Sequence, residues 1–266
     1  MDLEYGAEFE TFRAQLRAFL AANAAEAPRA GVGAGGGSRE RTLAWQRKLI
    51  ENGYAARTIP KAYGGYGAEP DILKSILIDE EFARAGVSRG IGGQGASMLV
   101  PTLLEHGNEE QKRAYVAPTI RGEMLWCQGY SEPGSGSDLA SLATRAREDG
   151  DDFVINGQKI WTSTAREAQM MFALVRTEPD ARKHEGISYL VFPMSTPGIE
   201  VRPLHTLTGN AEFNEVFFSD VRVPKSSLVG RRGEGWKIGN TTLRHERNML
   251  GSTSQTESLF ASLVEL

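Results

Sequence analysis

The sequence predicts an α+β protein with a helical first part, a middle part of short β-strands, and a return to helix at the end. Two patterns carry this prediction. Apolar residues recur every three to four positions in residues 1–122 and again after residue 232, which is the spacing of one helix face. Between them lie short segments rich in β-branched and aromatic residues, separated by turn residues, as in strands. We therefore predict three domains, 1–122, 123–231 and 232–266.

Residues 1–122 are predicted to form an all-helical N-terminal domain. A glycine-rich loop at residues 31–37 ends the first apolar stripe, and Ser38 is a typical N-cap for the next helix. The loop glycines have the spacing of a dinucleotide fingerprint, but no strand precedes them, so we interpret them as a surface loop. Helical spacing in residues 71–120 indicates two or three further helices. The first stripe consists of Phe9, Phe12, Leu16, Phe19 and Leu20.

Residues 123–231 are predicted to form a β-barrel or β-sandwich middle domain, and about 100 residues is an ordinary domain size. Residues 153–155 and 159–162 flank Asn156-Gly157. Because Asn-Gly supplies the positive φ angles of a type I′ turn, this stretch predicts a hairpin. Further strands are predicted at residues 170–175, 187–192, 199–201 and 215–218.

The last part is predicted to be a long helix. Residues 240–266 contain no proline, and their apolar stripe runs on without a cap. An amphipathic helix of this kind cannot bury its stripe alone. We therefore expect it to be the first helix of a truncated C-terminal helical bundle.

Composition and charge exclude several classes of protein. A net charge of -4 argues against a nucleic-acid surface, which needs a concentrated excess of Lys and Arg. No stretch approaches the run of about 20 apolar residues that spans a bilayer, and the acidic start of the chain fits no signal or transit peptide. The single cysteine, Cys127, excludes an internal disulfide, and no cysteine–histidine spacing indicates a metal site. These features favour a cytoplasmic protein.

Two motifs in the middle part carry chemistry. Residues 126–138 lead from a strand into a turn rich in glycine and serine, which exposes backbone N–H groups and hydroxyls. A flavin ring needs such a surface, because its pyrimidine edge is a row of donors and acceptors and its faces need flat apolar cover. Residues 157–163 follow about 25 positions later, where a neighbouring strand can return. There Trp161 offers the cover and Ser163 a hydroxyl.

These motifs resemble the acyl-CoA dehydrogenase family. Residues 130–138 are similar to its signature, residues 157–163 to its second flavin motif, and residues 214–224 to the strand that closes its middle domain. Residues 228–236 resemble the entry into its third domain. The resemblance implies an FAD cofactor and an acyl-CoA substrate. The sequence looks most similar to bacterial members that act on bulky or degradative acyl-CoAs. Some of those members are assembled from two different subunits.

The resemblance also implies roles for individual residues. Tyr130 and Ser131 match the strand that contacts the flavin through backbone and hydroxyl, and Trp161 matches the tryptophan that packs against the ring. Ser163 matches the hydroxyl that reaches the N5 region, where hydride arrives. The implied cofactor-binding residues are Gln128, Tyr130, Ser131, Trp161 and Ser163.

The reaction implied is α,β-dehydrogenation, in which a carboxylate removes the α-proton while the β-hydrogen leaves as hydride to flavin N5. Glu246 matches the base in part of the family, with Arg247 as a neighbour that orients the site and Ser137 near the pantetheine arm. In other members the base lies in a later loop that this chain lacks. A solvated Glu246, or one paired with Arg244 or Arg247, is the alternative interpretation.

Two other functions stay open. The chain could be a catalytically incomplete, flavin-poor structural or binding subunit of a heteromeric acyl-CoA dehydrogenase, because the family's third domain contacts the adenosine and pyrophosphate of FAD. It could also be an oxidase or monooxygenase on the same scaffold. We expect a homo- or hetero-oligomer with electron-transferring flavoprotein as the acceptor, and neither a nucleic-acid partner nor a membrane span.

Overall fold

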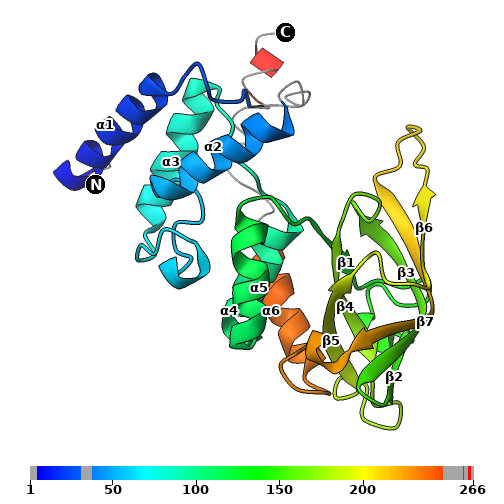
Figure 1. The fold of residues 1–266 in the computed structure, drawn as a ribbon. Helices are drawn as coiled ribbons and strands as arrows, with labels where there is room; N and C mark the ends of the chain where they lie inside the picture. The colour runs from blue at the N-terminus through cyan, green and yellow to red at the C-terminus, as the bar shows by residue number, and fades with distance from the viewer. Residues whose placement is uncertain (1–4, 31–37, 248–259, 261–262, 265–266) are drawn as a thin grey trace. The chain divides into compact units, whose positions relative to one another are not determined.

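The chain folds into two compact units, each of which is described by itself (Figure 1). The computed structural model describes residues 5–30, 38–247, 260 and 263–264. The predicted loop at residues 31–37, and nearly all of the predicted helix after Arg247, lie outside the described residues. The first unit comprises Met1–Ile91, Ile120–Gly122 and Met249–Leu266, and the second comprises Gly92–Thr119 and Glu123–Asn248.

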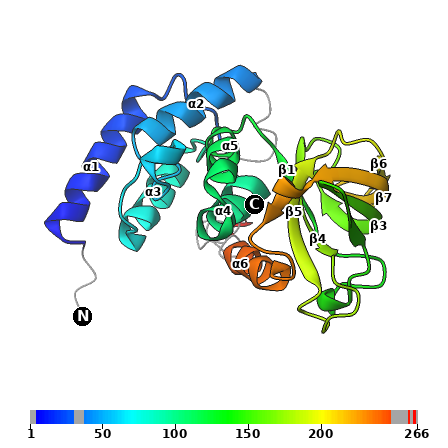
Figure 2. The same ribbon diagram turned by 60° about the horizontal axis from the view of Figure 1, so that its bottom comes forward.

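Helices build the first unit, as predicted: α1 (Ala7–Ala22), α2 (Arg39–Glu51) and α3 (Ile72–Ala85). α1 packs alongside α3 (Figure 2). The predicted N-cap of α2 is confirmed, because the Ser38 hydroxyl accepts a hydrogen bond from the backbone N–H of Arg41 at 3.2 Å. The apolar stripes of the three helices meet in a common core of Leu16, Leu20, Trp45, Leu49, Ile78 and Phe82.

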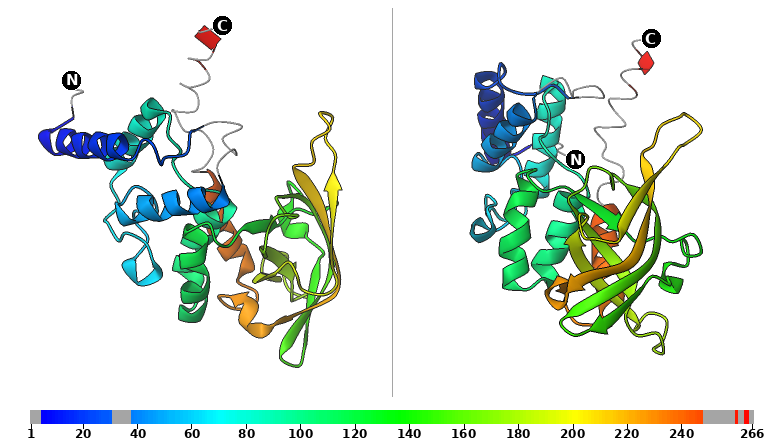
Figure 3. Two further views of the ribbon diagram at one scale, coloured as in Figure 1. Left: turned by 45° about the horizontal axis from the view of Figure 1, so that its top comes forward. Right: turned by 45° about the vertical axis from the view of Figure 1, so that its right-hand side comes forward.

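A curved sheet forms most of the second unit (Figure 3). Its strands follow the order β6-β7-β3-β2-β4-β5-β8, and β1 pairs with β4 beside this path. β4 pairs in parallel with β1 and with β2, whereas the other pairs are antiparallel. The strands are β1 (Trp126–Gly129), β2 (Arg145–Asp149), β3 (Asp152–Ser163), β4 (Met170–Arg176), β5 (Ile187–Pro193), β6 (Ile199–Leu204), β7 (Phe213–Pro224) and β8 (Leu228–Val229).

The sheet is buried on both faces at its centre. Alternate residues of β4 enter two different cores: Phe172 and Leu174 join one cluster, and Ala173 and Val175 the other. Two-sided burial explains why β4 and β5 read as continuous apolar runs instead of alternating ones. The predicted strands at residues 170–175 and 187–192 are confirmed, as is the α+β class.

Helices cover one face of this sheet. A π-helical turn, Gly95–Leu99, leads directly into α4 (Val100–His106), which is followed by α5 (Glu109–Ile120). After the sheet the chain returns as α6 (Gly235–Arg247), which contacts α4, β4 and β5 (Figure 2). Short 3-10 turns complete the fold at Lys61–Tyr63, Leu139–Ser141 and Lys225–Ser227.

The hairpin predicted at Asn156-Gly157 is wrong. β3 runs unbroken through both residues, and the turn lies earlier, between β2 and β3, where Asp149 pairs with Asp152. Asn156 is held by the neighbouring strand, since its side chain accepts from the Asp220 N–H at 2.9 Å. Gly157 does not form a turn. It allows the backbone of β3 to approach Thr144 closely, because a Cβ at Gly157 would lie 2.7 Å from the Cα of Thr144.

Candidate flavin and substrate site

A backbone hydrogen bond joins the two predicted flavin motifs. β1 runs parallel to β4 and delivers Tyr130 and Ser131 just past its end. The N–H of Ile160 on β3 donates to the carbonyl oxygen of Ser131 at 2.9 Å. Ser131 therefore lies beside the residue that precedes Trp161, so the two motifs share one edge of the second unit.

The turn after Ser131 is fixed by its own backbone. Glu132 and Ser135 exchange two N–H···O=C bonds of 2.9 Å, and the hydroxyls of Ser135 and Ser141 lie 2.8 Å apart. A Cβ added at Gly134 or Gly136 would meet nothing within 4 Å. The outer side of this turn is therefore open, with room for a ligand.

Ser137, the predicted pantetheine contact, lies exposed on this turn. The next residue, Asp138, forms an ion pair with Lys183 from the loop between β4 and β5. The loop also brings His184 against Trp236 at the start of α6, with ring centroids 4.6 Å apart. The surface around Ser137 thus combines charged and aromatic groups from three segments.

A buried ion pair ties β3 to the turn, and the sequence did not reveal it. The Lys159 ammonium is fully buried, and it donates to the Tyr130 carbonyl at 3.0 Å and to the Glu132 carboxylate at 2.8 Å. The other acceptor positions of Glu132 are taken by the N–H groups of Ala143 and Thr144, at 2.6 and 2.9 Å. Nothing in a single sequence marks a strand lysine as buried, although both charges belong to the motifs.

The charges of this pair stabilise each other against burial. Burial lowers the pKa of Lys159 to about 8, and the Glu132 carboxylate offsets part of that effect. Burial alone would raise the pKa of Glu132, but the Lys159 ammonium and the backbone donors hold it below its usual value. Both groups are therefore charged at neutral pH, and the pair clamps the carbonyl of Tyr130.

Trp161 is turned out of the sheet by a β-bulge. The register of β3 with β7 slips by one residue between Lys159 and Thr162, and Trp161 takes a left-handed φ of 59°. The indole is 60% exposed and packs only edge-on against Phe213, at 5.8 Å between ring centroids. A large aromatic ring held in a costly backbone conformation and offered to solvent is suited to cover a flat ligand.

The remaining predicted flavin residues surround this edge. Ser163 is half-buried and pairs with Phe213 on β7, two residues beyond Trp161. The side chain of Gln128, on β1, is half-buried and hydrogen-bonds to none of the described residues. The N–H groups of Tyr130 and Ser131 likewise find no acceptor among the described residues. Free N–H groups beside an exposed indole are the donor set that a flavin ring requires.

Glu246 lies on α6, half-buried, in the same unit. Its carboxylate forms no ion pair with the described residues, and its neighbours Arg244 and His245 pair with Glu105 of α4, at 2.5 and 3.3 Å. Arg247 is exposed. Burial is the main effect that raises the pKa of the Tyr130 phenol, and the Glu246 charge makes the smallest of the recorded contributions.

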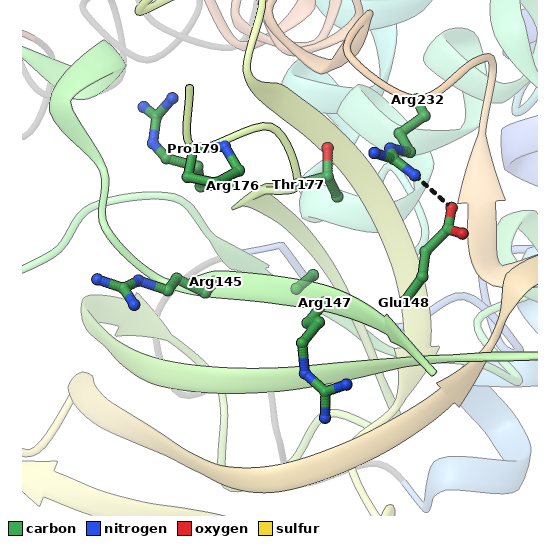
Figure 4. A pocket seen from close by; sticks show the side chains of 8 residues that line it. Arg145, Arg147, Glu148, Arg176, Thr177, Pro179 and Arg232 are labelled. Carbon is green, nitrogen blue, oxygen red and sulfur yellow. Dashed lines mark hydrogen bonds and ion pairs between the residues drawn. The ribbon is translucent and has the colours of Figure 1, made fainter. Parts of the chain in front are cut away.

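A cavity of about 400 Å³ lies elsewhere in the second unit, between β2 and the segment after β4 (Figure 4). Arg145 and Arg147 extend away from one another, and Arg232 donates to Glu148 at 2.7 Å (Figure 4). The Arg176 guanidinium bonds to the carbonyls of Leu142 and Ala140, so it is a structural support. None of the predicted site residues lines this cavity.

In the parts of the chain that the structure describes, no group of three His, Cys, Asp or Glu side chains is placed to hold a metal ion, and no helix has the length and apolarity to cross a bilayer. Cys127 is buried, and burial raises the pKa of its thiol to about 12. It is therefore an inert core residue.

Comparison with known families decides the assignment. Residues 6–123 match the acyl-CoA dehydrogenase N-terminal domain, and residues 127–221 match the acyl-CoA dehydrogenase middle domain. The acyl-CoA dehydrogenase IpdE1 of Mycobacterium tuberculosis is 43% identical to the chain, across 97% of the chain and 69% of that protein. The chain belongs to the acyl-CoA dehydrogenase family. This family is FAD-dependent, as the motifs implied.

Solved acyl-CoA dehydrogenases share the fold. The Tcur3481-Tcur3483 steroid ACAD superimposes with a TM-score of 0.72 at 38% identity, over 93% of this chain and 63% of that one. The ChsE4-ChsE5 complex of Mycobacterium tuberculosis gives a TM-score of 0.70 at 33% identity, over 92% and 61%. This acyl-CoA dehydrogenase chain thus spans somewhat less than two thirds of the solved chains.

Proposed function

We propose that the protein catalyses the FAD-dependent α,β-dehydrogenation of an acyl-CoA thioester. The observation that carries the proposal is the hydrogen bond from Ile160 to Ser131, which joins the segment that carries the exposed Trp161 indole to the segment that carries the two free backbone N–H groups. FAD, when bound, accepts the hydride in this chemistry. We also propose that the protein works in the cytoplasm.

The residues of this chain have the chemistry to bind and orient the flavin. We assign the ring-edge contacts to the backbone of Tyr130 and Ser131 and the side chain of Gln128, ring cover to Trp161, and the N5-side hydroxyl to Ser163. The Lys159–Glu132 pair supports this assignment, because it clamps the Tyr130 carbonyl, which belongs to the same peptide as the Ser131 N–H.

Glu246 is our candidate for the base that takes the α-proton. Its carboxylate has no ion-pair partner among the described residues, so it is available to accept a proton. Because the α-carbon of a thioester is a weak acid, the site must also polarise the thioester carbonyl. We assign Arg247 to orienting the site and Ser137 to the pantetheine arm. A base in a later loop of the full protein is the alternative to Glu246.

Substitution of the base tests this function. The full-length protein, with any partner subunit that it needs, is assayed for dye reduction by acyl-CoAs, and the flavin content is measured in the same preparation. Glu246→Gln should retain flavin but lose turnover by about a hundredfold or more, as expected for a general base. Glu110→Gln, an exposed carboxylate on α5, is the matched control and should keep turnover. Equal activities of both variants would place the base elsewhere.

A second candidate function is a flavin-poor structural or binding subunit of a heteromeric acyl-CoA dehydrogenase. It is favoured by two similar solved structures, the Tcur3481-Tcur3483 steroid ACAD and the ChsE4-ChsE5 complex, because each of them is named for two components. Co-expression with candidate partner subunits would distinguish the two functions. Flavin that appears only in the two-subunit complex supports a heteromer, whereas a stable flavinated homo-oligomer supports an enzyme complete in itself. For the enzyme, we propose electron-transferring flavoprotein as the acceptor.

A further inference from the structure

A cavity of about 490 Å³ follows the segment of the second unit that carries Ser163, and we refer to it as the Arg166 pocket. Its walls come from the turn at residues 165–169, from Met194 and Ser195 after β5, and from Val201 on β6. The turn begins two residues after Ser163, and Arg166 follows one position later. Because three residues span at most about 11 Å, the pocket lies close to the proposed N5 contact.

The turn that carries Arg166 is anchored on both sides. Ala165 and Ala168 are buried in one core of the sheet, and a backbone hydrogen bond of 3.0 Å closes the turn at Ala168. The Gln169 carbonyl accepts from the N–H of Met194 at 2.9 Å, which joins the turn to the opposite wall of the pocket. Arg166 lies between the two buried alanines, so its exposed side chain starts from a backbone that packing holds in place.

Arg166 gives the pocket a positive charge without a partner. It is the one charged residue among the described residues that line the pocket, and its guanidinium forms no hydrogen bond or ion pair with the described part of the chain. The backbone N–H groups of Ala165 and Arg166 likewise donate to no described group. The adjacent carboxylate, Glu167, does not line the pocket. A guanidinium and free N–H groups on one turn are all donors, which suits an anion.

FAD is the anion that the proposed function brings to this part of the molecule. Its diphosphate follows the ring after a short ribityl chain, so the residues that bind the diphosphate must lie near those that contact the ring. The proposed ring contacts, Trp161 and Ser163, end the strand from which the turn with Arg166 continues. A planar guanidinium binds phosphate oxygens through two parallel hydrogen bonds. The position and the chemistry of Arg166 therefore both fit the diphosphate of this cofactor.

We propose that the Arg166 pocket binds the diphosphate of FAD, with the Arg166 guanidinium as the cation that this chain itself contributes. The inference rests on the proposed dehydrogenase function, which assigns the flavin ring to the edge with Trp161 and Ser163. This chain then distinguishes FAD from riboflavin, which has the same ring and no phosphate. Acyl-CoA carries a diphosphate too, but we assign its pantetheine arm to the turn with Ser137, a different segment. The position of the pocket therefore favours FAD, and the experiment tests CoA as the other source.

A pair of flavins tests the inference. The full-length apoprotein, with any partner subunit that it needs, is titrated with FAD and with riboflavin, and both dissociation constants are measured from the quenching of flavin fluorescence. Arg166→Gln should weaken FAD binding about tenfold, which is the scale of one hydrogen bond to a charged group, and should leave riboflavin binding unchanged. Arg166→Lys, which keeps the charge, should lose less. Arg147→Gln, which changes an exposed arginine on β2, is the matched control and should bind both flavins like the wild type.

A competing anion gives a second readout on the same proteins. Inorganic pyrophosphate should weaken FAD binding to the wild type and should have less effect on Arg166→Gln. Equal FAD affinities of Arg166→Gln and the wild type, or equal losses for FAD and riboflavin, overturn the inference. A raised KM for acyl-CoA with normal FAD affinity assigns the pocket to CoA and overturns it as well. A wild type that binds riboflavin retains the proposed flavin site in each of these cases, whereas a wild type that binds neither flavin refutes the proposed function together with this inference.

Discussion

Replacing Lys159 with methionine removes the ammonium that ties β3 to the flavin turn, with little change in side-chain size. The ammonium is fully buried and bonds to the Tyr130 carbonyl at 3.0 Å and to Glu132 at 2.8 Å. Glu132, only 8% exposed, would then keep its charge with backbone donors alone. Because an uncompensated buried charge costs about 3–5 kcal/mol, Lys159→Met should lower the free energy of unfolding by about that amount at neutral pH.

A double-mutant cycle separates the ion pair from packing. Glu132→Gln and the double variant are measured beside Lys159→Met by urea denaturation, with the flavin dissociation constant determined on each protein. The double variant should cost about 1–3 kcal/mol less than the sum of the single variants, because its buried charge has been removed together with the partner. Flavin affinity should fall in Lys159→Met, where Tyr130 loses its clamp. Additive costs, or a single-variant cost below about 1 kcal/mol as at a surface pair, would refute this reasoning.

Two further predictions concern Trp161 and His106. Trp161→Ala should weaken flavin binding about tenfold, on the scale of one aromatic stacking contact, with an unchanged melting temperature because the indole is 60% exposed; a large melting shift with normal flavin affinity would contradict its role. Burial lowers the pKa of His106 below 6.5, so the unfolded chain takes up this proton first as the pH falls. The unfolding free energy should therefore drop below pH 6.5 in the wild type relative to His106→Gln, and parallel pH profiles would speak against it.

Local signals made much of the fold predictable. Ser38 was predictable as a cap because its hydroxyl bonds to an N–H only three residues away. Residues 170–175 read as a strand because both faces of β4 are apolar. The hairpin at Asn156-Gly157 failed because a tertiary contact outweighed turn propensity: Thr144 packs against Gly157, and β7 pairs with β3 along its whole length.

The candidate site was predictable through its motifs and not through its geometry. The resemblance located Ser131 and Trp161, but only the structure gives the β-bulge that exposes the indole. Lys159 sits in the second motif as an ordinary polar residue of a strand, and its complete burial depends on Glu132, 27 positions away.

Anaerobic mixing of the purified full-length protein with a reactive acyl-CoA gives the most direct test that the edge formed by Ser131 and Trp161 holds a flavin and that α6 supplies the base. The wild type should carry flavin and show bleaching of its absorbance within the assay, whereas Glu246→Gln should carry the same flavin without bleaching. Purified protein that contains no flavin, even with its partner subunit, or a Glu246→Gln variant that is reduced as fast as the wild type, would contradict the account.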